Sequence, residues 1–289
     1  NPAAFDTEKY KFGANLLNDP ATGKLVGDFN ADGCTDIALW REGWHSTPVY
    51  FSNCDGSFRW TNFANLATTN WINDPGVRRI VGDFNGDRRA DILLSRAGWT
   101  SAPVYFSNGG GTFTVTNVAL ASNFNVLNDM SAAPLVGDFD ADGRTDIALA
   151  RAGWNSTPIY FSLGTGAFRT TNFITSTAEI NDPLARRSVG DFNGDGRSDV
   201  LVTRAGYATP ITWLSSGAGW FTRVAVATTG NHLNGVGEML FGDFNNDRRT
   251  DVVVRAPGMS STPLHFATAG GAFQVSYDAH LSSENWINQ

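Results

Sequence analysis

Five short stretches of this sequence carry oxygen-bearing side chains at a fixed spacing. Each begins with the Asp of a Gly-Asp-Phe tripeptide, continues with Asn or Asp at the third position, and has Asp at the fifth and ninth positions. The side chains are Asp28, Asn30, Asp32 and Asp36; Asp83, Asn85, Asp87 and Asp91; Asp138, Asp140, Asp142 and Asp146; Asp191, Asn193, Asp195 and Asp199; and Asp243, Asn245, Asp247 and Asp251. Oxygen ligands at positions 1, 3 and 5, with a backbone carbonyl at position 7, are the pattern of a calcium-binding loop. The carbonyls would come from Cys34, Arg89, Arg144, Arg197 and Arg249.

These acidic loops predict about five bound Ca²⁺ ions with a structural role. Clustered carboxylates repel one another unless a cation lies between them, and a bound ion would link folding stability to free calcium. The alternative is that Asp and Asn simply cap tight turns. All five copies keep the acids at positions 1, 5 and 9, which favours calcium. Magnesium fits less well because it demands a tighter octahedron and keeps its waters.

A second recurring pattern combines an aromatic residue, an arginine and an Asn-Asp pair. Each Arg-x-x-aromatic segment follows a predicted strand, and an element of the type Trp-Ile-Asn-Asp precedes each acidic loop. An aromatic ring suits the apolar C–H face of a pyranose, and a few fixed polar groups suit its hydroxyls. The predicted carbohydrate-binding residues are Arg41, Trp44, Trp71, Asn73, Asp74, Arg96, Trp99, Asn128, Asp129, Arg151, Trp154, Asn181, Asp182, Arg204 and Tyr207.

Each part of this second pattern also has a purely structural interpretation. The aromatic rings could fill the wedge between neighbouring sheets, and the arginines could pair with nearby acids. The Asn-Asp pair could be a turn that positions the next strand. The first three copies are the better sugar-site candidates, because the fourth has Tyr207 and the fifth has Met259 in place of Trp.

The repeat itself predicts the elements that position these residues. The Asp of Gly-Asp-Phe recurs at 28, 83, 138, 191 and 243, a period of 52 to 55 residues, and such a period indicates a repeat architecture. In the second repeat, short apolar runs at 79–84, 91–95, 103–107 and 112–116 predict four strands bounded by turn residues. Four short antiparallel strands per repeat predict an all-β, five-bladed β-propeller with a calcium loop in each blade.

We expect one propeller domain over residues 1–289, with blades near 24–63, 79–117, 134–172, 187–225 and 238–277. The Gly-Asp-Phe strand is expected to be innermost. A copy of the Asn-Trp-Ile-Asn element at 285–289, and residues 1–20, predict that the termini close blade five against blade one. The alternative is five blades of a larger propeller. In an up-and-down meander the acidic loops lie on one face, and the aromatic loops and blade linkers lie on the other.

The acidic loops resemble the FG-GAP/VCBS repeats of integrin α-subunit propellers and of many secreted bacterial and fungal proteins. The resemblance covers essentially the whole chain. The aromatic-rich loops are also similar to those of mushroom propeller lectins that bind N-acetylglucosamine between blades. The lectin signature residues cannot be matched one by one, and five blades depart from the six or seven usual in these families.

These features favour a multivalent lectin that binds glycans of the N-acetylglucosamine type or other sugars at its blade junctions. Several equivalent sites on one rigid scaffold gain avidity. The alternative is an integrin-like adhesion module that binds protein. A glycoside hydrolase is disfavoured because it needs paired unique carboxylates, whereas Glu8, Glu42, Glu179, Glu238 and Glu284 lie in no distinctive motif. We therefore predict that the chain is not an enzyme.

Charge, hydropathy and cysteine content limit the possible partners and cellular location of the protein. A formal net charge of −7 argues against nucleic acid, and no apolar run approaches the roughly 20 residues of a membrane helix. The chain has no basic-then-apolar leader, so we expect any signal peptide to be already removed or never present. Cys34 and Cys54 fall in loops on the same face, so a disulfide is geometrically feasible, with two free thiols as the alternative. The pair favours a secreted, extracellular protein, and no feature specifies an oligomeric state.

Overall fold

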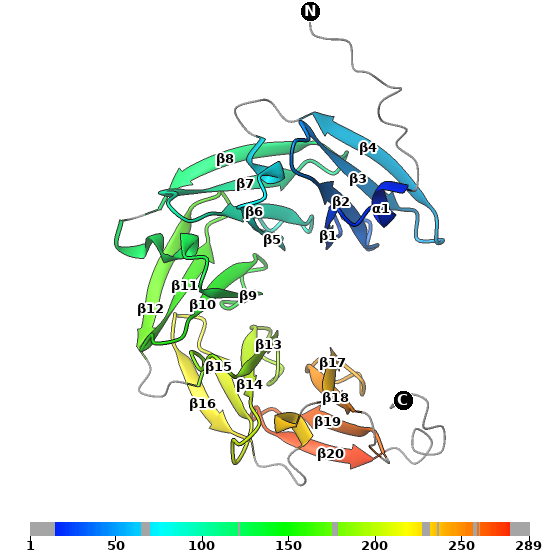
Figure 1. Cartoon of the computed structure of the whole chain (residues 1–289). Coiled ribbons are helices and arrows are strands. Elements are labelled where there is room, and N and C mark those ends of the chain that lie inside the picture. The colour runs from blue at the N-terminus through cyan, green and yellow to red at the C-terminus, as the bar shows by residue number, and fades with distance from the viewer. Residues whose placement is uncertain are drawn as a thin grey trace, which may run out of the picture. The chain divides into compact units, whose positions relative to one another are not determined.

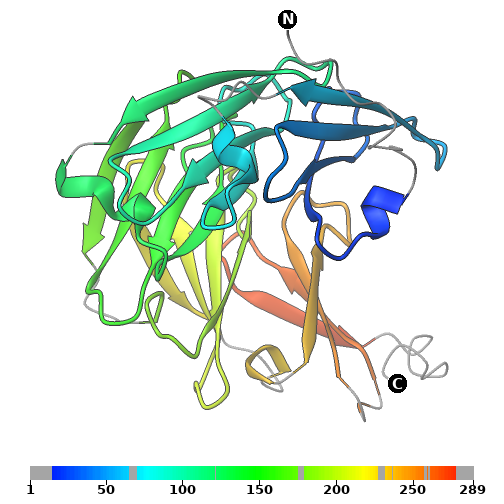
Figure 2. The same cartoon turned by 45° about the horizontal axis from the view of Figure 1, so that its top comes forward.

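The structure is a computed structural model that describes residues 15–64, 70–120, 122–174, 179–226, 232–235, 237–256, 259 and 261–277. It is all-β and contains five four-stranded antiparallel sheets, each built from four consecutive strands (Figures 1 and 2). This is the composition of a five-bladed propeller, and each sheet is called a blade below. The predicted copy at 285–289 and most of the N-terminal segment lie outside the described residues.

The blades follow one another along the chain. Blade one contains β1 (Gly23–Gly27), β2 (Asp36–Trp40), β3 (Ser46–Ser52) and β4 (Phe58–Ala64). Blade two contains β5 (Arg78–Gly82), β6 (Asp91–Ser95), β7 (Ser101–Ser107) and β8 (Phe113–Ala119). Blade three contains β9 (Ala133–Gly137), β10 (Asp146–Ala150), β11 (Ser156–Ser162) and β12 (Phe168–Ile174).

Blade four contains β13 (Arg186–Gly190), β14 (Asp199–Thr203), β15 (Ile211–Ser215) and β16 (Phe221–Ala225). Blade five contains β17 (Glu238–Gly242), β18 (Asp251–Arg255), β19 (Pro263–Ala267) and β20 (Phe273–Tyr277). Short helical segments precede four of the blades: α1 (Asn15–Asn18), η1 (Asn70–Asn73), η2 (Ser122–Asn128) and η3 (His232–Asn234). No described helix has the length and apolar character needed to cross a membrane.

The strand predictions for the second repeat were close to the observed strands. The first predicted strand reached residue 84, but β5 ends at Gly82 because Asp83 already belongs to the acidic loop. In every blade the first strand lies at one edge of the sheet. Its last Gly pairs with the ninth-position Asp, as Gly27 does with Asp36. The acidic loop therefore connects the first two strands of each blade.

The chain divides into two compact units. The first unit holds blades one and two, and the second holds Phe84–Gly86 together with residues from Leu120 onward, which include blades three to five. Each unit is described by itself. The prediction of one domain closed through its termini stays a prediction.

Within each unit, adjacent blades are joined through the start of the acidic loop. In the first unit, Phe29 is fully buried against Phe113 of blade two, with ring centroids 6.1 Å apart. The Oγ of Ser107 donates to the Phe29 carbonyl at 2.6 Å, and the Ala90 N–H donates to the Asp28 carbonyl at 2.6 Å.

The second unit repeats this arrangement between blades three and four. Phe139 packs against Phe221 at 5.8 Å, and Ser215 Oγ donates to the Phe139 carbonyl at 2.7 Å. The close approach of blades four and five also explains why residue 190 is a glycine. A Cβ on Gly190 would lie 2.8 Å from the side chain of Thr250 in blade five, so a larger residue would push the two blades apart.

Candidate functional site

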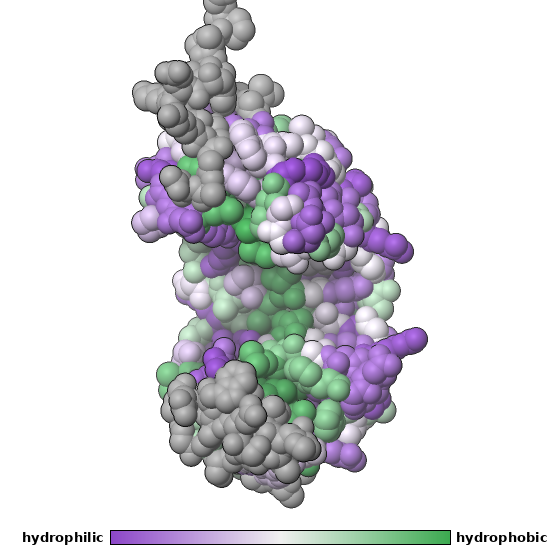
Figure 3. Space-filling model, turned by 90° about the vertical axis from the view of Figure 1, so that its right-hand side faces the viewer, coloured by the Kyte–Doolittle hydropathy of each residue, from purple (hydrophilic) through white to green (hydrophobic). Residues whose placement is uncertain are grey.

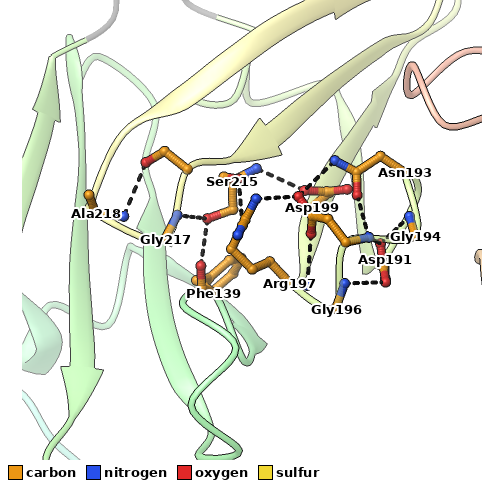
Figure 4. A network of polar contacts seen from close by, with 12 residues as sticks. Phe139, Asp191, Asn193, Gly194, Gly196, Arg197, Asp199, Ser215, Gly217 and Ala218 are labelled. Carbon is orange, nitrogen blue, oxygen red and sulfur yellow. Dashed lines mark hydrogen bonds and ion pairs between the residues drawn. The ribbon is translucent and has the colours of Figure 1, made fainter.

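The ninth-position Asp of each acidic loop is a buried structural residue. Asp146 is fully buried; its Oδ1 accepts from the Ser162 N–H at 2.8 Å and its Oδ2 from the Phe139 N–H at 2.9 Å. Asp199 makes the equivalent bonds to Ser215 and Phe192, at 2.8 and 3.1 Å. This carboxylate ties the loop to the end of the third strand, and Figure 4 shows the arrangement in blade four. Burial raises the pKa of both Asp146 and Asp199 to about 7, although these hydrogen bonds favour the ionised form.

The loop of blade three has a donor set that fits a hard divalent cation. Asp138, Asp140 and Asp146 each offer a carboxylate oxygen, and these oxygens lie within 4.8 Å of one another. Asp140 Oδ1 is buried and has no hydrogen-bond partner among the described residues. Burial, followed by the charges of Asp142 and Asp138, raises the pKa of Asp140. Carboxylate oxygens in this number and proximity are the ligands that Ca²⁺ prefers.

The same loop also has the hydrogen bonds of a tight turn. Asp138 Oδ1 accepts from the Asp142 N–H at 3.2 Å, and its Oδ2 accepts from the Gly143 N–H at 2.9 Å. In blade four, Asn193 occupies the third position and donates through its amide to Asp195 Oδ2 at 2.9 Å. The residues that cap this turn are therefore the same ones that were predicted to bind a cation.

Four loops also contain a cation of their own, at the seventh position. The guanidinium group of Arg197 ion-pairs with Asp195, and its Nε donates to the Ser215 carbonyl at 3.0 Å (Figure 4). The equivalent arginines are Arg89, Arg144 and Arg249, paired with Asp87, Asp142 and Asp247. From the sequence, these arginines were predicted to contribute only their backbone carbonyls, and the side-chain role was missed. Their recurrence two residues after the fifth-position Asp was the available signal.

Blade one replaces this arginine link by a covalent one. Cys34 stands at the seventh position, and a disulfide joins it to Cys54 in the turn between β3 and β4, with the Cα atoms 5.7 Å apart. Both links therefore connect the acidic loop to the outer part of its own blade. The two sulfur atoms lie near Asp32, but as a disulfide they offer no thiolate to a metal.

The Asn of each Asn-Asp pair is used inside the protein. Asn73 is 3% exposed; its Oδ1 accepts from the Arg41 N–H at 3.1 Å, and its amide donates to the carbonyls of Trp44 and Ser46 at 3.1 and 3.0 Å. Asn181 repeats these bonds in the second unit, and Asn128 is buried as well. The amides of Asn73 and Asn181 therefore hold the aromatic loop to the blade linker, and the carbohydrate-binding roles of Asn73, Asn128 and Asn181 stay predictions.

The Asp of each pair instead binds the arginine of the following aromatic loop. Asp74 pairs with Arg96, Asp129 with Arg151, and Asp182 with Arg204. Arg41 pairs with Asp19, at 2.7 Å. The sequence analysis did not include Asp19, although its place in the first Asn-Asp copy identified it. These side chains are partly exposed, so the pairs present both charges at the surface.

A wide pocket lies in the second unit. It has a volume of about 750 Å³ and is lined by Trp154 of blade three, by Glu179 to Leu184 of the linker (except the buried Ile180), and by Arg204 and Tyr207 of blade four. Tyr207 donates its hydroxyl to Asp182 Oδ2 at 2.7 Å. Burial and this bond raise the pKa of Tyr207 to about 12. Burial acts to raise the pKa of Asp182, but hydrogen bonds from Tyr207, Leu184 and Arg204 lower it overall.

The first unit has a smaller pocket at the linker and aromatic loop of blade two. Its volume is about 240 Å³, and it is lined mainly by Trp71, Trp99, Ser101 and Asn117. The two indole rings meet edge to face, with centroids 6.2 Å apart. Part of the space between linker and loop is therefore occupied by aromatic side chains.

Trp44 is a buried core residue. It is only 9% exposed and belongs to a core cluster with Leu39 and Tyr50, against which Leu16 and Leu17 pack. The carbohydrate-binding role of Trp44 therefore stays a prediction, made for a ring that is buried in this structure.

These observations define a class of protein: an all-β repeat chain of four-stranded blades with an acidic loop in each blade. The FG-GAP-like repeat family matches residues 28–94, 83–149, 138–202 and 191–254, so each match spans parts of two successive blades. The chain belongs to the FG-GAP-like repeat family.

Several individual proteins are similar to this chain. A lectin of Agrocybe aegerita, solved for its specific recognition of non-reducing terminal N-acetylglucosamine, is similar over 89% of this chain and 66% of its own, with a TM-score of 0.70 and 19% identity. The Photorhabdus luminescens Tc holotoxin pore is similar over 88% of this chain and 12% of its own, with a TM-score of 0.56 and 14% identity. Protein linkin of Caenorhabditis elegans is 40% identical over 73 residues, which are 23% of this chain and 12% of linkin. The chain thus spans about an eighth of linkin and just under two thirds of the lectin, and the two solved structures show likeness of fold alone.

Proposed function

We propose that this protein is a carbohydrate-binding propeller of the lectin type, with a sugar site in the pocket between blades three and four. The observation that carries the proposal is that pocket, in which Trp154 and Tyr207 stand with the Arg204–Asp182 ion pair. Aromatic rings and a few fixed polar groups are the requirements of a pyranose site. The fold likeness to a lectin that recognises N-acetylglucosamine supports a sugar of that type.

The polar groups of the pocket are held in place before any ligand arrives. Asp182 accepts from Tyr207 and pairs with Arg204, which fixes one acceptor and several N–H donors at the pocket wall. Groups that need no rearrangement lose little entropy when they bind a hydroxyl. The lowered pKa of Asp182 keeps it ionised near neutral pH, which suits an acceptor and not the general acid of a glycosidase. The proposal is therefore binding without catalysis.

We further propose that the acidic loops bind calcium as a structural ion. In blade three the ligands would be Asp138, Asp140, Asp142 and Asp146 with the Arg144 carbonyl, and the unpartnered Oδ1 of Asp140 supports this assignment. A bound ion would offset part of the negative charge of the carboxylates and hold the turn between the first two strands. The equivalent residues of the other four blades would serve in the same way, and repeated blade junctions would allow multivalent binding. The disulfide supports an extracellular location.

The sugar site is tested by glycan-array screening followed by calorimetric titration of the best sugar. We expect Trp154→Ala and Tyr207→Ala to weaken binding by about tenfold or more, because each removes a ring that would cover the sugar. Trp220→Ala is the matched control, since Trp220 is an exposed Trp that does not line the pocket. Equal affinities for wild type and both pocket variants would contradict the proposed site.

A protein-binding adhesion module is the second candidate. It is favoured by Leu184, which is 68% exposed at the pocket rim and could receive an apolar side chain of a partner. In that case the glycan array would give no signal, and Leu184→Asp would abolish binding of a protein partner. If the sugar proposal is correct, the array responds and Trp154→Ala removes the response.

A further inference from the structure

The pockets of the two units have different linings, but one lining position is directly comparable through the repeat. Ile180-Asn181-Asp182 aligns with Ile72-Asn73-Asp74, so Glu179 stands where the first unit has Trp71. In the first unit the Trp71 ring packs against Trp99, and the pocket measures about 240 Å³. In the second unit a carboxylate replaces the indole, and the pocket measures about 750 Å³. The replacement exchanges an apolar plate for a hydrogen-bond acceptor.

The Glu179 carboxylate has one satisfied oxygen and one unsatisfied oxygen. Its Oε1 accepts from Arg223 Nε at 3.1 Å and lies 3.0 Å from Arg223 Nη2. Its Oε2 is buried and has no hydrogen-bond partner among the described residues. A buried acceptor without a partner is costly, and more so when it carries charge. A ligand donor that reaches Oε2 would relieve that cost.

The anchoring by Arg223 limits where this acceptor can move. The guanidinium comes from β16 of blade four, and the Asp182 N–H donates to the Glu179 carbonyl at 3.2 Å. Glu179 is thus fixed at both its backbone and its side chain. The remaining oxygen stands on the same linker segment as Asp182, which already serves Arg204 and Tyr207. Among the pocket carboxylates, Glu179 has the acceptor oxygen that is not yet used.

We propose that Glu179 is a specificity-determining residue of this pocket, where its Oε2 accepts a hydrogen bond from a hydroxyl or amide N–H of the bound sugar. This inference rests on the proposed function and adds that the site between blades three and four selects its ligand differently from the Trp-lined position of the first unit. The ligand class is a pyranose that directs a donor group toward the linker.

The test compares Glu179→Gln and Glu179→Trp with the wild-type protein, using the methyl glycoside of N-acetylglucosamine in calorimetry and a glycan array for selectivity. Glu179→Gln keeps the shape but loses the charge, so we expect about tenfold weaker binding and a changed ranking of sugars. Glu179→Trp installs the residue of the first unit and should remove the site. Glu42→Gln is the matched control, because Glu42 is exposed in an aromatic loop and does not line the pocket.

The outcomes separate this inference from the proposed function. Binding that is lost in Trp154→Ala but unchanged in affinity and ranking in both Glu179 variants overturns the inference and leaves the sugar site standing. A wild-type protein that binds no sugar overturns both. Unchanged melting temperatures confirm that a variant is folded, and Glu179→Gln keeps the test decisive if Glu179→Trp does not fold.

Discussion

At the residue scale, His265 shows how one substitution in a repeat changes the chemistry of a blade. The strand register places it opposite Val252, the position held by Tyr105 in blade two and Tyr160 in blade three. The Tyr160 hydroxyl accepts from the Leu127 N–H at 3.1 Å. His265 is fully buried, and neither ring nitrogen has a partner among the described residues. Burial, followed by the nearby His232, lowers the pKa of His265 to about 4.

This lowered pKa predicts acid sensitivity that a single substitution removes. Between pH 6.5 and 4 the unfolded state binds a proton that the folded state excludes, so stability falls as pH falls through this range. At pH 5 the loss is about 2 kcal/mol. We expect His265→Tyr to melt with less pH dependence than wild type between pH 7.5 and 5, while His45→Asn, at an exposed histidine, behaves like wild type. Parallel curves for wild type and His265→Tyr would show that His265 is not responsible.

Two tryptophans show that residue type alone does not predict burial. Trp44 and Trp154 stand in nearly identical sequence contexts, yet Trp44 is in the core and Trp154 lines the large pocket. The difference lies in what precedes each blade: Leu16 and Leu17 pack onto the Trp44 cluster. Asn73 and Asn181 were likewise predicted to contact sugar as fixed polar groups, and the structure shows both buried with their amides bonded to backbone carbonyls. The sequence around a residue therefore does not predict whether a neighbouring segment buries its side chain.

At the element scale, the acidic loop contains both a charge-balancing cation and a buried hydrogen-bonding Asp, and the sequence predicted these two features only in part. Its position between the first two strands and its alignment with Gly-Asp-Phe were predictable from spacing. The need for a counter-cation was predictable too, but Arg144 supplies one positive charge to Asp142 without any metal. The ninth-position Asp146 has a structural role of its own through two backbone hydrogen bonds.

These bonds predict unequal effects of two matched substitutions in one loop. Asp146→Asn places an amide donor against a backbone N–H, so we expect it to cost about 2 to 4 kcal/mol of unfolding free energy. Asp140→Asn should cost less than about 1 kcal/mol, because the other four loops have Asn at this position. Urea unfolding measures both. Equal costs would mean that the buried bonds of Asp146 do not set the stability of the loop.

Calcium binding makes a separate prediction for the loops. If the ions bind the folded loops, millimolar calcium should raise the melting temperature and chelator should lower it, by an amount set by the ratio of free calcium to its dissociation constant. Sugar affinity at the pocket should change less than the melting temperature, since the pocket residues do not overlap the loop ligands. Scanning calorimetry with calcium and with chelator is the measurement, and identical melting in both would contradict the cation proposal.

At the scale of the whole molecule, each blade repeats the same Phe on the surface that faces the next blade, but this Phe is not buried in every blade. Phe192 of blade four is fully buried against Phe273 of blade five, whereas the equivalent Phe244 of blade five is 48% exposed. Leu240 and Phe241 of β17 are exposed as well. Figure 3 views the side on which β17 and β18 lie in Figure 1 and shows hydrophobic surface there. The number of blades was predictable from the repeat, but whether blade five closes against blade one was not, because each blade carries the same two faces.

This difference in burial predicts that Phe→Ala lowers the free energy of unfolding by different amounts at positions 192 and 244. Phe192→Ala should cost about 3 to 5 kcal/mol, as expected for a buried Phe, whereas Phe244→Ala should cost less than about 1 kcal/mol because its ring contacts solvent. Chemical unfolding of the two variants gives the comparison. A cost for Phe244→Ala equal to that for Phe192→Ala would mean that this face is covered in solution, as the closure expected from the termini requires.

The central claim is that a sugar ring binds between blades three and four, and a crystal structure of the protein soaked with N-acetylglucosamine tests it most directly. We expect electron density for a pyranose in the pocket lined by Trp154, Glu179 and Tyr207, with a polar group of the sugar within hydrogen-bond distance of the Glu179 carboxylate. Density at another surface, or a pocket that stays empty at saturating sugar while the array shows binding, would contradict it.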